Sequence, residues 1–116
     1  MDIRLFPPEE ILETTVALPP SKSIGTRAMV LNYIAGTALS ADNSCDDTAT
    51  LSSILSAGLP VGGGEINVGP AGTAMRFLTA LFAASEGVDC TLTGSERMLK
   101  RPIGPLVTVL RKIGAD

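Results

Sequence analysis

Residues 18–28, LPPSKSIGTRA, combine two prolines, two serines and two cations at the predicted start of a helix. The first backbone N–H groups of a helix have no partner within it and carry partial positive charge, so an anion there gains hydrogen bonds and a favourable field. Ser21 or Ser23 can cap the helix, and Lys22 adds a mobile charge. Arg27 follows Ser23 by one turn and can hold an oxyanion through two hydrogen bonds. The stretch predicts either an anion site or an ordinary capped helix with two solvated cations.

Two further stretches repeat this plan. PAGTAMR (residues 70–76) has a glycine that lets a ligand approach the backbone, a hydroxyl, and an arginine one turn later. GSERMLKRPIG (residues 94–104) has three cations before a proline that suits the first turn of a helix. The residues concerned are Gly72, Thr73, Arg76, Arg97, Lys100, Arg101 and Pro102. Three cationic helix starts in one short chain predict a small anionic ligand, most simply a phosphorylated one.

The composition of the 116-residue chain predicts one globular domain with an aliphatic core. Hydrophobic residues make up 45% of it and aromatic residues only 3%, and this length suffices for a core of its own. The net charge of −3 and the lack of a basic stripe disfavour nucleic-acid binding. No apolar run is long enough to span a bilayer, and the N-terminus does not read as a secretory segment. We therefore expect a cytoplasmic protein without nucleic-acid or membrane partners.

Histidine is absent from the chain, which restricts the chemistry available to it. Ser–His and Cys–His nucleophilic schemes are excluded, and so is the commonest metal ligand, so catalysis would depend on lysine, arginine, carboxylates and hydroxyls. Cys45 and Cys90 are far apart and in no metal-ligand spacing. We expect both to be free thiols, with Cys90 in the core, and we expect no metal site.

Apolar spacing and turn residues predict an α/β domain in which strands and helices alternate. Strands are expected where short β-branched or alternating runs end at proline or glycine, and helices where apolar residues recur every three or four positions. A strand or an extended connection is expected over residues 37–43. The other predicted strands are residues 1–6, 14–18, 65–68 and 88–93, and the predicted helices are residues 22–35, 46–57, 72–84 and 102–113.

Two details of the predicted helices concern the candidate site. Asp46 and Asp47 open the second helix, and we favour an N-cap with first-turn charge over a catalytic role for this pair. In the first helix one set of apolar residues recurs at helical spacing, and we expect it to face the core. These residues are Ile24, Ala28, Leu31 and Ile34 or Ala35.

Four stretches are similar, in order, to successive signatures of the 5-enolpyruvylshikimate-3-phosphate synthases, also called 3-phosphoshikimate 1-carboxyvinyltransferases. The resemblance covers essentially the whole chain from residue 14 onward. A sister family that transfers enolpyruvyl to UDP-N-acetylglucosamine shares the fold but is not similar at SKS and GTAMR. The matching stretches are LPPSKSI (residues 18–24), DDT (46–48), AGTAMR (71–76) and LTGSERMLKRPIG (92–104).

The resemblance implies transfer of the enolpyruvyl group of phosphoenolpyruvate to the 5-hydroxyl of shikimate 3-phosphate, with release of phosphate. This step belongs to the shikimate route to chorismate and the aromatic amino acids. The implied mechanism is addition then elimination through a tetrahedral intermediate, and it requires no metal or organic cofactor. Proteins of this family are usually monomeric.

The family's fold, carried over by resemblance, has two similar domains, each made of three βαβαββ units in an inside-out α/β barrel. Its active site lies in the cleft between the domains. Residues 15–116 would form the first part of one substrate-binding domain, and residues 1–14 would pack with the other domain. The family's general acid and base have no counterpart here, so the isolated chain is expected to be inactive, and its exposed apolar surface favours self-association.

The family's site residues carry over onto matching positions of this chain. Lys22 would be the catalytic residue, between the two substrates, and would contact both of them. The expected shikimate 3-phosphate residues are Lys22, Ser23 and Arg27; the expected phosphoenolpyruvate residues are Lys22, Gly72 and Arg101; Thr73 and Arg76 would support the second group.

The chain departs from the family pattern at three places. Pro70 stands where the family typically has asparagine, and Phe77 replaces a proline found in many members. The stretch 59–66 is shorter than usual. These changes bear on phosphoenolpyruvate affinity and on sensitivity to glyphosate, an inhibitor that competes with phosphoenolpyruvate.

Two other classes of function remain open from the sequence. A stand-alone anion-binding module would bind phosphate compounds in general, without selectivity for shikimate 3-phosphate. A structural or interaction domain would use the same motifs as helix caps and would bind no such ligand.

Overall fold

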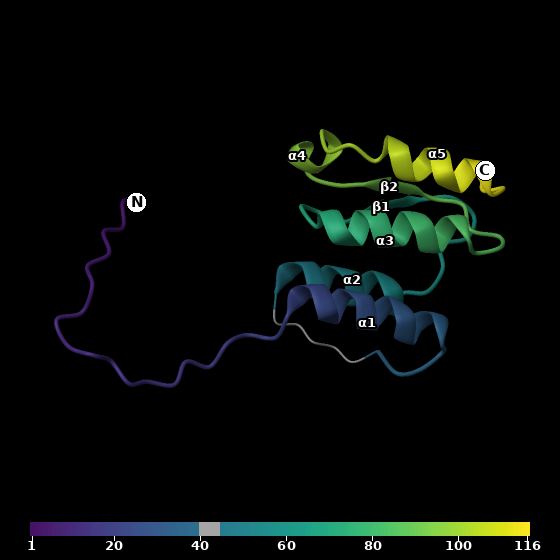
Figure 1. Cartoon of the computed structure of the whole chain (residues 1–116). Helices are drawn as coiled ribbons and strands as arrows, with labels where there is room; N and C mark the ends of the chain where they lie inside the picture. Colours follow the sequence, from purple (N-terminus) through teal and green to yellow (C-terminus); the bar gives the residue numbers. More distant parts are fainter. Residues whose placement is uncertain (40–44) are drawn as a thin grey trace.

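The computed structural model describes residues 1–39 and 45–116 of the chain. In the described part helices and short strands alternate, which confirms the predicted α/β class (Figure 1). The elements are α1 (Lys22–Ile34), α2 (Asp46–Ser56), β1 (Glu65–Asn67), α3 (Gly72–Ala83), β2 (Thr91–Thr93), α4 (Glu96–Leu99) and α5 (Gly104–Lys112).

The predicted strands at residues 1–6 and 14–18 are wrong. Residues 1–20 form no helix or strand, are exposed throughout, and extend away from the body of the molecule (Figure 1). A strand forms only where a neighbouring strand accepts its backbone hydrogen bonds, and the described residues offer this segment none. Residues 37–39 form no strand either, while residues 40–43 of that predicted connection lie outside the described part.

The strands β1 and β2 pair in parallel, with Glu65 opposite Thr91 and Asn67 opposite Thr93. Both are shorter than the sequence predicts. Parallel strands need a crossover connection, and α3 supplies it, so that β1, α3 and β2 form a βαβ unit. Figure 1 shows α1 and α2 side by side below α3, and α4 and α5 above the sheet.

The core lies where α1, α2 and the sheet meet α3. The three helices each contribute at least one side chain that is almost fully buried, α3 contributes the most, and the sheet adds the partly buried Ile66 and Leu92. A helix buried on several sides is what the nearly all-round apolar sequence of α3 predicts. The buried apolar residues are Met29, Leu51, Leu55, Val68, Ala71, Ala74, Met75, Leu78, Phe82 and Met98.

The face of α1 that packs is different from the one predicted. Ile24 is 71% exposed and Leu31 65% exposed, whereas Met29 and Thr26 are almost fully buried. Thr26 can be buried because its hydroxyl donates to the carbonyl oxygen of Lys22 at 2.9 Å. Spacing could not choose between two apolar faces of one helix, and packing against α2 and α3 selects the face around Met29.

The segment after β2 also differs from the prediction. A short helix, α4, occupies part of the cationic stretch, and its N-cap Ser95 accepts a hydrogen bond from the backbone N–H of Met98. The following helix begins at Gly104, not at Pro102, and Pro105 occupies its first turn. Cys90 is half-buried against the core, as predicted, and burial raises the pKa of its thiol.

The loops that follow the two strands cross at the same end of the sheet. The backbone N–H of Ser95 donates to the carbonyl oxygen of Gly69 at 2.9 Å. A Cβ atom at Gly94 would lie 2.7 Å from the same carbonyl oxygen and 2.9 Å from Cγ of Met98. The close approach of the two loops therefore requires glycine at position 94.

We predict that Gly94→Ala lowers the free energy of unfolding by about 1–3 kcal/mol, because the new methyl group overpacks the loop crossing. Gly104→Ala is the matched control, since a Cβ atom there meets nothing within 4 Å. Its free energy of unfolding should change by less than about 0.5 kcal/mol. Urea unfolding followed by circular dichroism measures both, and equal effects of the two substitutions would contradict the prediction.

Candidate functional site

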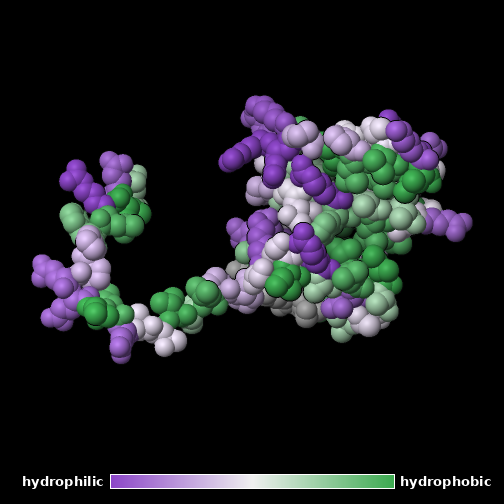
Figure 2. Space-filling view, viewed as in Figure 1, coloured by the Kyte–Doolittle hydropathy of each residue, from purple (hydrophilic) through white to green (hydrophobic). Residues whose placement is uncertain are grey.

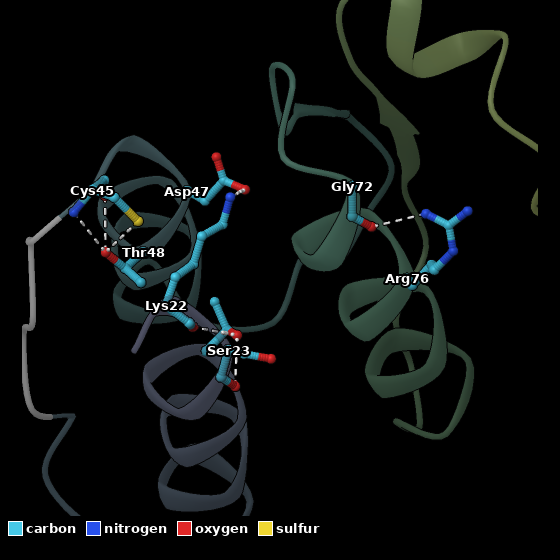
Figure 3. Close-up of polar contacts among 8 residues, drawn as sticks. Lys22, Ser23, Cys45, Asp47, Thr48, Gly72 and Arg76 are labelled. Atoms are coloured by element: carbon cyan, nitrogen blue, oxygen red, sulfur yellow. Dashed lines mark hydrogen bonds and ion pairs between the residues drawn. The ribbon is translucent and has the colours of Figure 1, made fainter. Parts of the chain in front are cut away.

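The helices α1, α2 and α3 all begin at one end of the molecule, the end at which β1 and β2 finish (Figure 1). The residues selected from the sequence lie in the first two turns of α1 and α3 or in the segment after α4. Figure 3 shows two groups: Lys22 and Ser23 lie beside the start of α2, and Gly72 and Arg76 lie at the start of α3.

Ser21 caps the start of α1, so the hydroxyl of Ser23 is not used for capping. Ser21 is the N-cap and accepts a hydrogen bond from the backbone N–H of Ile24 at 3.4 Å. One guanidinium nitrogen of Arg27 donates to Oγ of Ser23 at 2.5 Å and to its carbonyl oxygen at 2.9 Å. The sequence left both serines as candidate caps, and the structure assigns this role to Ser21.

Lys22 forms an ion pair with Asp47 in the first turn of α2, with Nζ 2.5 Å from Oδ2 (Figure 3). The side chain of Lys22 is 50% exposed and that of Asp47 16% exposed, so the ammonium group remains accessible to a ligand. The hydrogen bond to Asp47 raises the pKa of Lys22 above the ordinary value of 10.5; burial opposes this, and the charge of Asp47 adds to it. Lys22 is therefore a cation at neutral pH.

Asp47 is a site residue that the sequence interpretation missed. The first-turn position predicted for Asp46 and Asp47 is confirmed, but the N-cap is Cys45. The partnership between Asp47 and Lys22 joins residues on different helices, so no spacing along the chain could reveal it. The one feature of the sequence that could have pointed to Asp47 was the acidic pair Asp46 and Asp47, because the other selected helix starts carry cations.

Cys45 and Thr48 close the start of α2. The hydroxyl of Thr48 donates to the carbonyl oxygen of Cys45 at 2.8 Å and lies 3.4 Å from its Sγ (Figure 3). The Thr48 hydroxyl, backbone N–H groups of α2 and the charge of Lys22 lower the pKa of the Cys45 thiol. This cap holds the first turn of α2, and with it Asp47, in place.

At the start of α3 the guanidinium group of Arg101 lies against Gly72. A Cβ atom at Gly72 would come within 2.9 Å of the guanidinium carbon of Arg101, so a side chain at this position would displace the guanidinium. The two residues assigned together from the sequence are thus neighbours in space. Thr73 is the next residue of α3 and is half-buried.

Arg76 joins the start of α3 to the segment that carries Arg101. One of its guanidinium nitrogens donates to the carbonyl oxygen of Gly72 at 3.1 Å, and the other to that of Pro102 at 2.9 Å. Both hydrogen bonds are made to the backbone, which is the arrangement expected of a supporting residue. Of the other cations in this stretch, Lys100 pairs with Glu96 at 2.6 Å, and both side chains are largely exposed.

The cations are unfavourably placed for the helices themselves. Lys22 is the first residue of α1, and Arg101 lies against the first residue of α3. A helix N-terminus carries partial positive charge and is stabilised by anions, so cations there oppose the helix dipole. An anion bound between the backbone N–H groups and these side chains would remove that repulsion.

Neither metal chemistry nor a membrane span has support in the described residues. Residues 1–39 and 45–116 contain no group of three or more histidine, cysteine, aspartate or glutamate side chains that could hold a metal ion. No helix within these ranges has both the length and the apolar character needed to cross a membrane.

Sequence comparison matches residues 57–116 to the family described as EPSP synthase (3-phosphoshikimate 1-carboxyvinyltransferase). Curated relatives carry the name 3-phosphoshikimate 1-carboxyvinyltransferase. One from Bacteroides fragilis strain YCH46 is 42% identical over 106 residues, covering 90% of this chain and 25% of the relative. One from Rhizobium etli is 37% identical over 135 residues, covering 98% of this chain and 32% of the relative. No solved structure matches the chain.

The chain thus spans about a quarter to a third of the length of the curated relatives it matches. A third relative, from Erwinia tasmaniensis, agrees with this, at 36% identity over 136 residues and 31% of its length.

We predict that Asp47→Asn lowers the pKa of Lys22 toward its ordinary value, because the substitution removes the partner charge. Asp46→Asn is the matched control, since Asp46 shares the first turn of α2 but lies outside the ion pair. Titration of the Lys22 side chain by NMR measures both variants. An unchanged Lys22 pKa in Asp47→Asn, or equal shifts in the two variants, would show that the pair does not persist in solution.

The same pair has a pH dependence with a definite sign. Because folding raises the pKa of Lys22, the ion pair contributes its stability at neutral pH and loses it as the pH rises through that pKa. In Asp47→Asn the free energy of unfolding should therefore decrease less steeply as the pH rises through the pKa of Lys22, as urea unfolding at a series of alkaline pH values would measure. With one partner half exposed, the effect is expected to be small, about 0.2–1 kcal/mol.

Proposed function

The chain belongs to the EPSP synthase (3-phosphoshikimate 1-carboxyvinyltransferase) family, and from this membership we propose that it forms part of an enolpyruvyl-transferring site. The reaction proposed is transfer of the enolpyruvyl group of phosphoenolpyruvate to the 5-hydroxyl of shikimate 3-phosphate, in the shikimate pathway of the cytoplasm. No metal or organic cofactor is needed in this proposal. It is carried by one observation: the cations stand at helix starts, where they disfavour the helices but suit a bound anion.

Lys22, Ser23 and Arg27 form the proposed shikimate 3-phosphate group. Their functional atoms come from the first two turns of α1, beside helix N–H groups that an oxyanion can accept from. Arg27 uses one guanidinium nitrogen on Ser23, which leaves its other donors for a phosphate. The ammonium group of Lys22 has three hydrogens, and its ion pair with Asp47 is made to a single oxygen, Oδ2. The other hydrogens can donate to a bound anion.

Gly72 and Arg101 form the proposed phosphoenolpyruvate group, with Thr73 and Arg76 in support. The backbone of α3 begins at Gly72, and the guanidinium of Arg101 lies against it. A carboxylate or phosphate could therefore be held by backbone N–H groups and a planar cation together. Pro70 has neither a backbone N–H nor a side-chain amide, so this loop lacks both kinds of donor that the asparagine typical of the family offers.

In the proposed reaction the 5-hydroxyl gives up its proton to a general base as its oxygen bonds to C2 of phosphoenolpyruvate, while the methylene carbon takes up a proton from a general acid. The tetrahedral intermediate then loses phosphate from C2 and a proton from the new methyl group, which restores the double bond. Lys22, a cation at neutral pH, can stabilise developing negative charge on phosphate but cannot serve as a base. Asp47, the carboxylate nearest to it, is already paired with Lys22.

We further propose that residues 15–116 are the first part of a substrate-binding domain made of βαβαββ units, and that residues 1–14 pack with another domain. The β1–α3–β2 crossover is compatible with such a unit. The proposed general acid and base come from parts of the enzyme outside this chain. The isolated chain should therefore bind its ligands without turning them over.

We predict that shikimate 3-phosphate, added to the isotope-labelled 116-residue chain, shifts the NMR signals of Lys22, Ser23 and Arg27 more than inorganic phosphate does. Arg27→Leu should weaken this binding by about 10- to 100-fold, because it removes a charge-assisted hydrogen-bonding group. Arg111→Leu, in the last turn of α5, is the control and should bind normally.

Identical responses to the two ligands would support a general phosphate-binding module, and no response to either would support a structural domain. With phosphoenolpyruvate also present, the chain should release no phosphate. Measurable turnover would contradict the proposal that the acid and base lie elsewhere.

We also propose that the isolated chain self-associates through apolar surface. Figure 2 shows this surface along the N-terminal segment and over the lower helices, while hydrophilic side chains gather near α4. On α1, Leu31 and Ile34 are each 65% exposed. The exposed apolar side chains of residues 1–20 are Met1, Ile3, Leu5, Phe6, Ile11, Leu12, Val16 and Leu18.

We predict that the sedimentation coefficient of the chain rises with protein concentration, since burying this apolar surface in a second copy removes it from water. Leu31→Lys should reduce the rise, whereas Thr108→Lys, on the exposed side of α5, should not. A coefficient that stays at the monomer value at all concentrations would exclude self-association.

A further inference from the structure

Arg27 lies over the aromatic ring of Phe77, a contact between α1 and α3 that joins positions fifty residues apart. The guanidinium carbon of Arg27 is 5.8 Å from the centroid of the ring. A cation within about 6 Å of an aromatic face is attracted to its π-electrons. Phe77 itself is half-buried and lines a groove of about 500 Å³ between α1 and α3, together with Val30, Tyr33 and Leu81.

The two contacts of Arg27 restrain it in different ways. Ser23 holds one guanidinium nitrogen, but that nitrogen alone leaves the plane of the group free to turn. The ring of Phe77 adds a flat surface on which the guanidinium can rest. With one face against the ring and one nitrogen on Ser23, the remaining donor edge stays open to solvent and to a ligand.

The residue that carries the ring is the sequence neighbour of a member of the second cationic group. Phe77 directly follows Arg76, whose guanidinium is hydrogen-bonded to the carbonyl oxygens of Gly72 and Pro102. The turn of α3 that carries the ring is thereby tied to the segment that carries Arg101. A single aromatic side chain thus connects the start of α1 with the start of α3.

We propose that Phe77 is a positioning residue for Arg27: it orders the guanidinium before any anion arrives and so raises affinity at the start of α1. Ordering a long side chain on binding costs conformational entropy, and a side chain already held loses less. The identity of the ligand, shikimate 3-phosphate, rests on the proposed function; the contact between ring and guanidinium does not. Proline at this position, as the family resemblance gives for many members, could not supply an aromatic ring.

Arginine side-chain NMR of the full 116-residue chain tests the contact directly. In the unsubstituted protein, the Nε–H signal of Arg27 should be displaced by the ring current relative to that of Arg111, an exposed arginine on α5. Phe77→Tyr keeps the ring and should keep the displacement. Phe77→Leu keeps an apolar side chain in the groove but should move the signal to the range of Arg111.

Titration with shikimate 3-phosphate tests the consequence. Phe77→Leu should bind about threefold to tenfold more weakly than the unsubstituted chain, and Phe77→Tyr should stay within about twofold. Amide spectra of each variant establish that it is folded. If Phe77→Leu does not fold, the displacement of the Arg27 signal in the unsubstituted chain and in Phe77→Tyr still decides the matter.

Two results would overturn the proposal: an Arg27 signal without ring-current displacement, or a folded Phe77→Leu variant that binds shikimate 3-phosphate as tightly as the unsubstituted chain. A chain whose Arg27 signal depends on the ring, but which does not prefer shikimate 3-phosphate to inorganic phosphate, would retain the positioning role and refute the proposed function. The two proposals can therefore fail separately.

Discussion

The parallel pairing of β1 with β2 is the constraint on which the rest of the arrangement depends. Parallel strands cannot be joined by a tight turn, so the chain must return along α3 before it can form the second strand. The loops that leave both strands consequently meet at one end, where the backbone N–H of Ser95 donates to the carbonyl oxygen of Gly69 and Gly94 lies close to the same oxygen. The start of α3 and the segment carrying Arg101 are brought together there.

The charges at this end are held by neighbours on other elements. Lys22 contacts Asp47 of α2, and Arg27 lies over the ring of Phe77 of α3. Arg76 donates hydrogen bonds to the backbone carbonyl oxygens of Gly72 and Pro102. None of these contacts neutralises the cations at the helix starts completely. Stability alone would favour acidic residues there, as the first turn of α2 illustrates, and the proposed anionic ligand would account for the cations.

The same packing leaves apolar surface uncovered. The helix α1 is apolar on two faces, and only the face around Met29 contacts the core, while Ile24 and Leu31 face solvent. Both strands of the sheet also lack an outer partner among the described residues. The chain with these uncovered surfaces spans about a quarter to a third of its relatives' length.

The sequence by itself determined the four longer helices, the α/β class and the family, because helix starts, glycine stops and short phosphate-binding motifs are local signals. It also placed Gly72 and Arg101 in one group, which the structure bears out as neighbours. Only the tertiary structure decided which face of α1 is buried, and that Asp47 contacts Lys22 and Phe77 contacts Arg27. Spacing along a chain reports which residues share a face, but which face finds a partner depends on elements that lie far away in sequence.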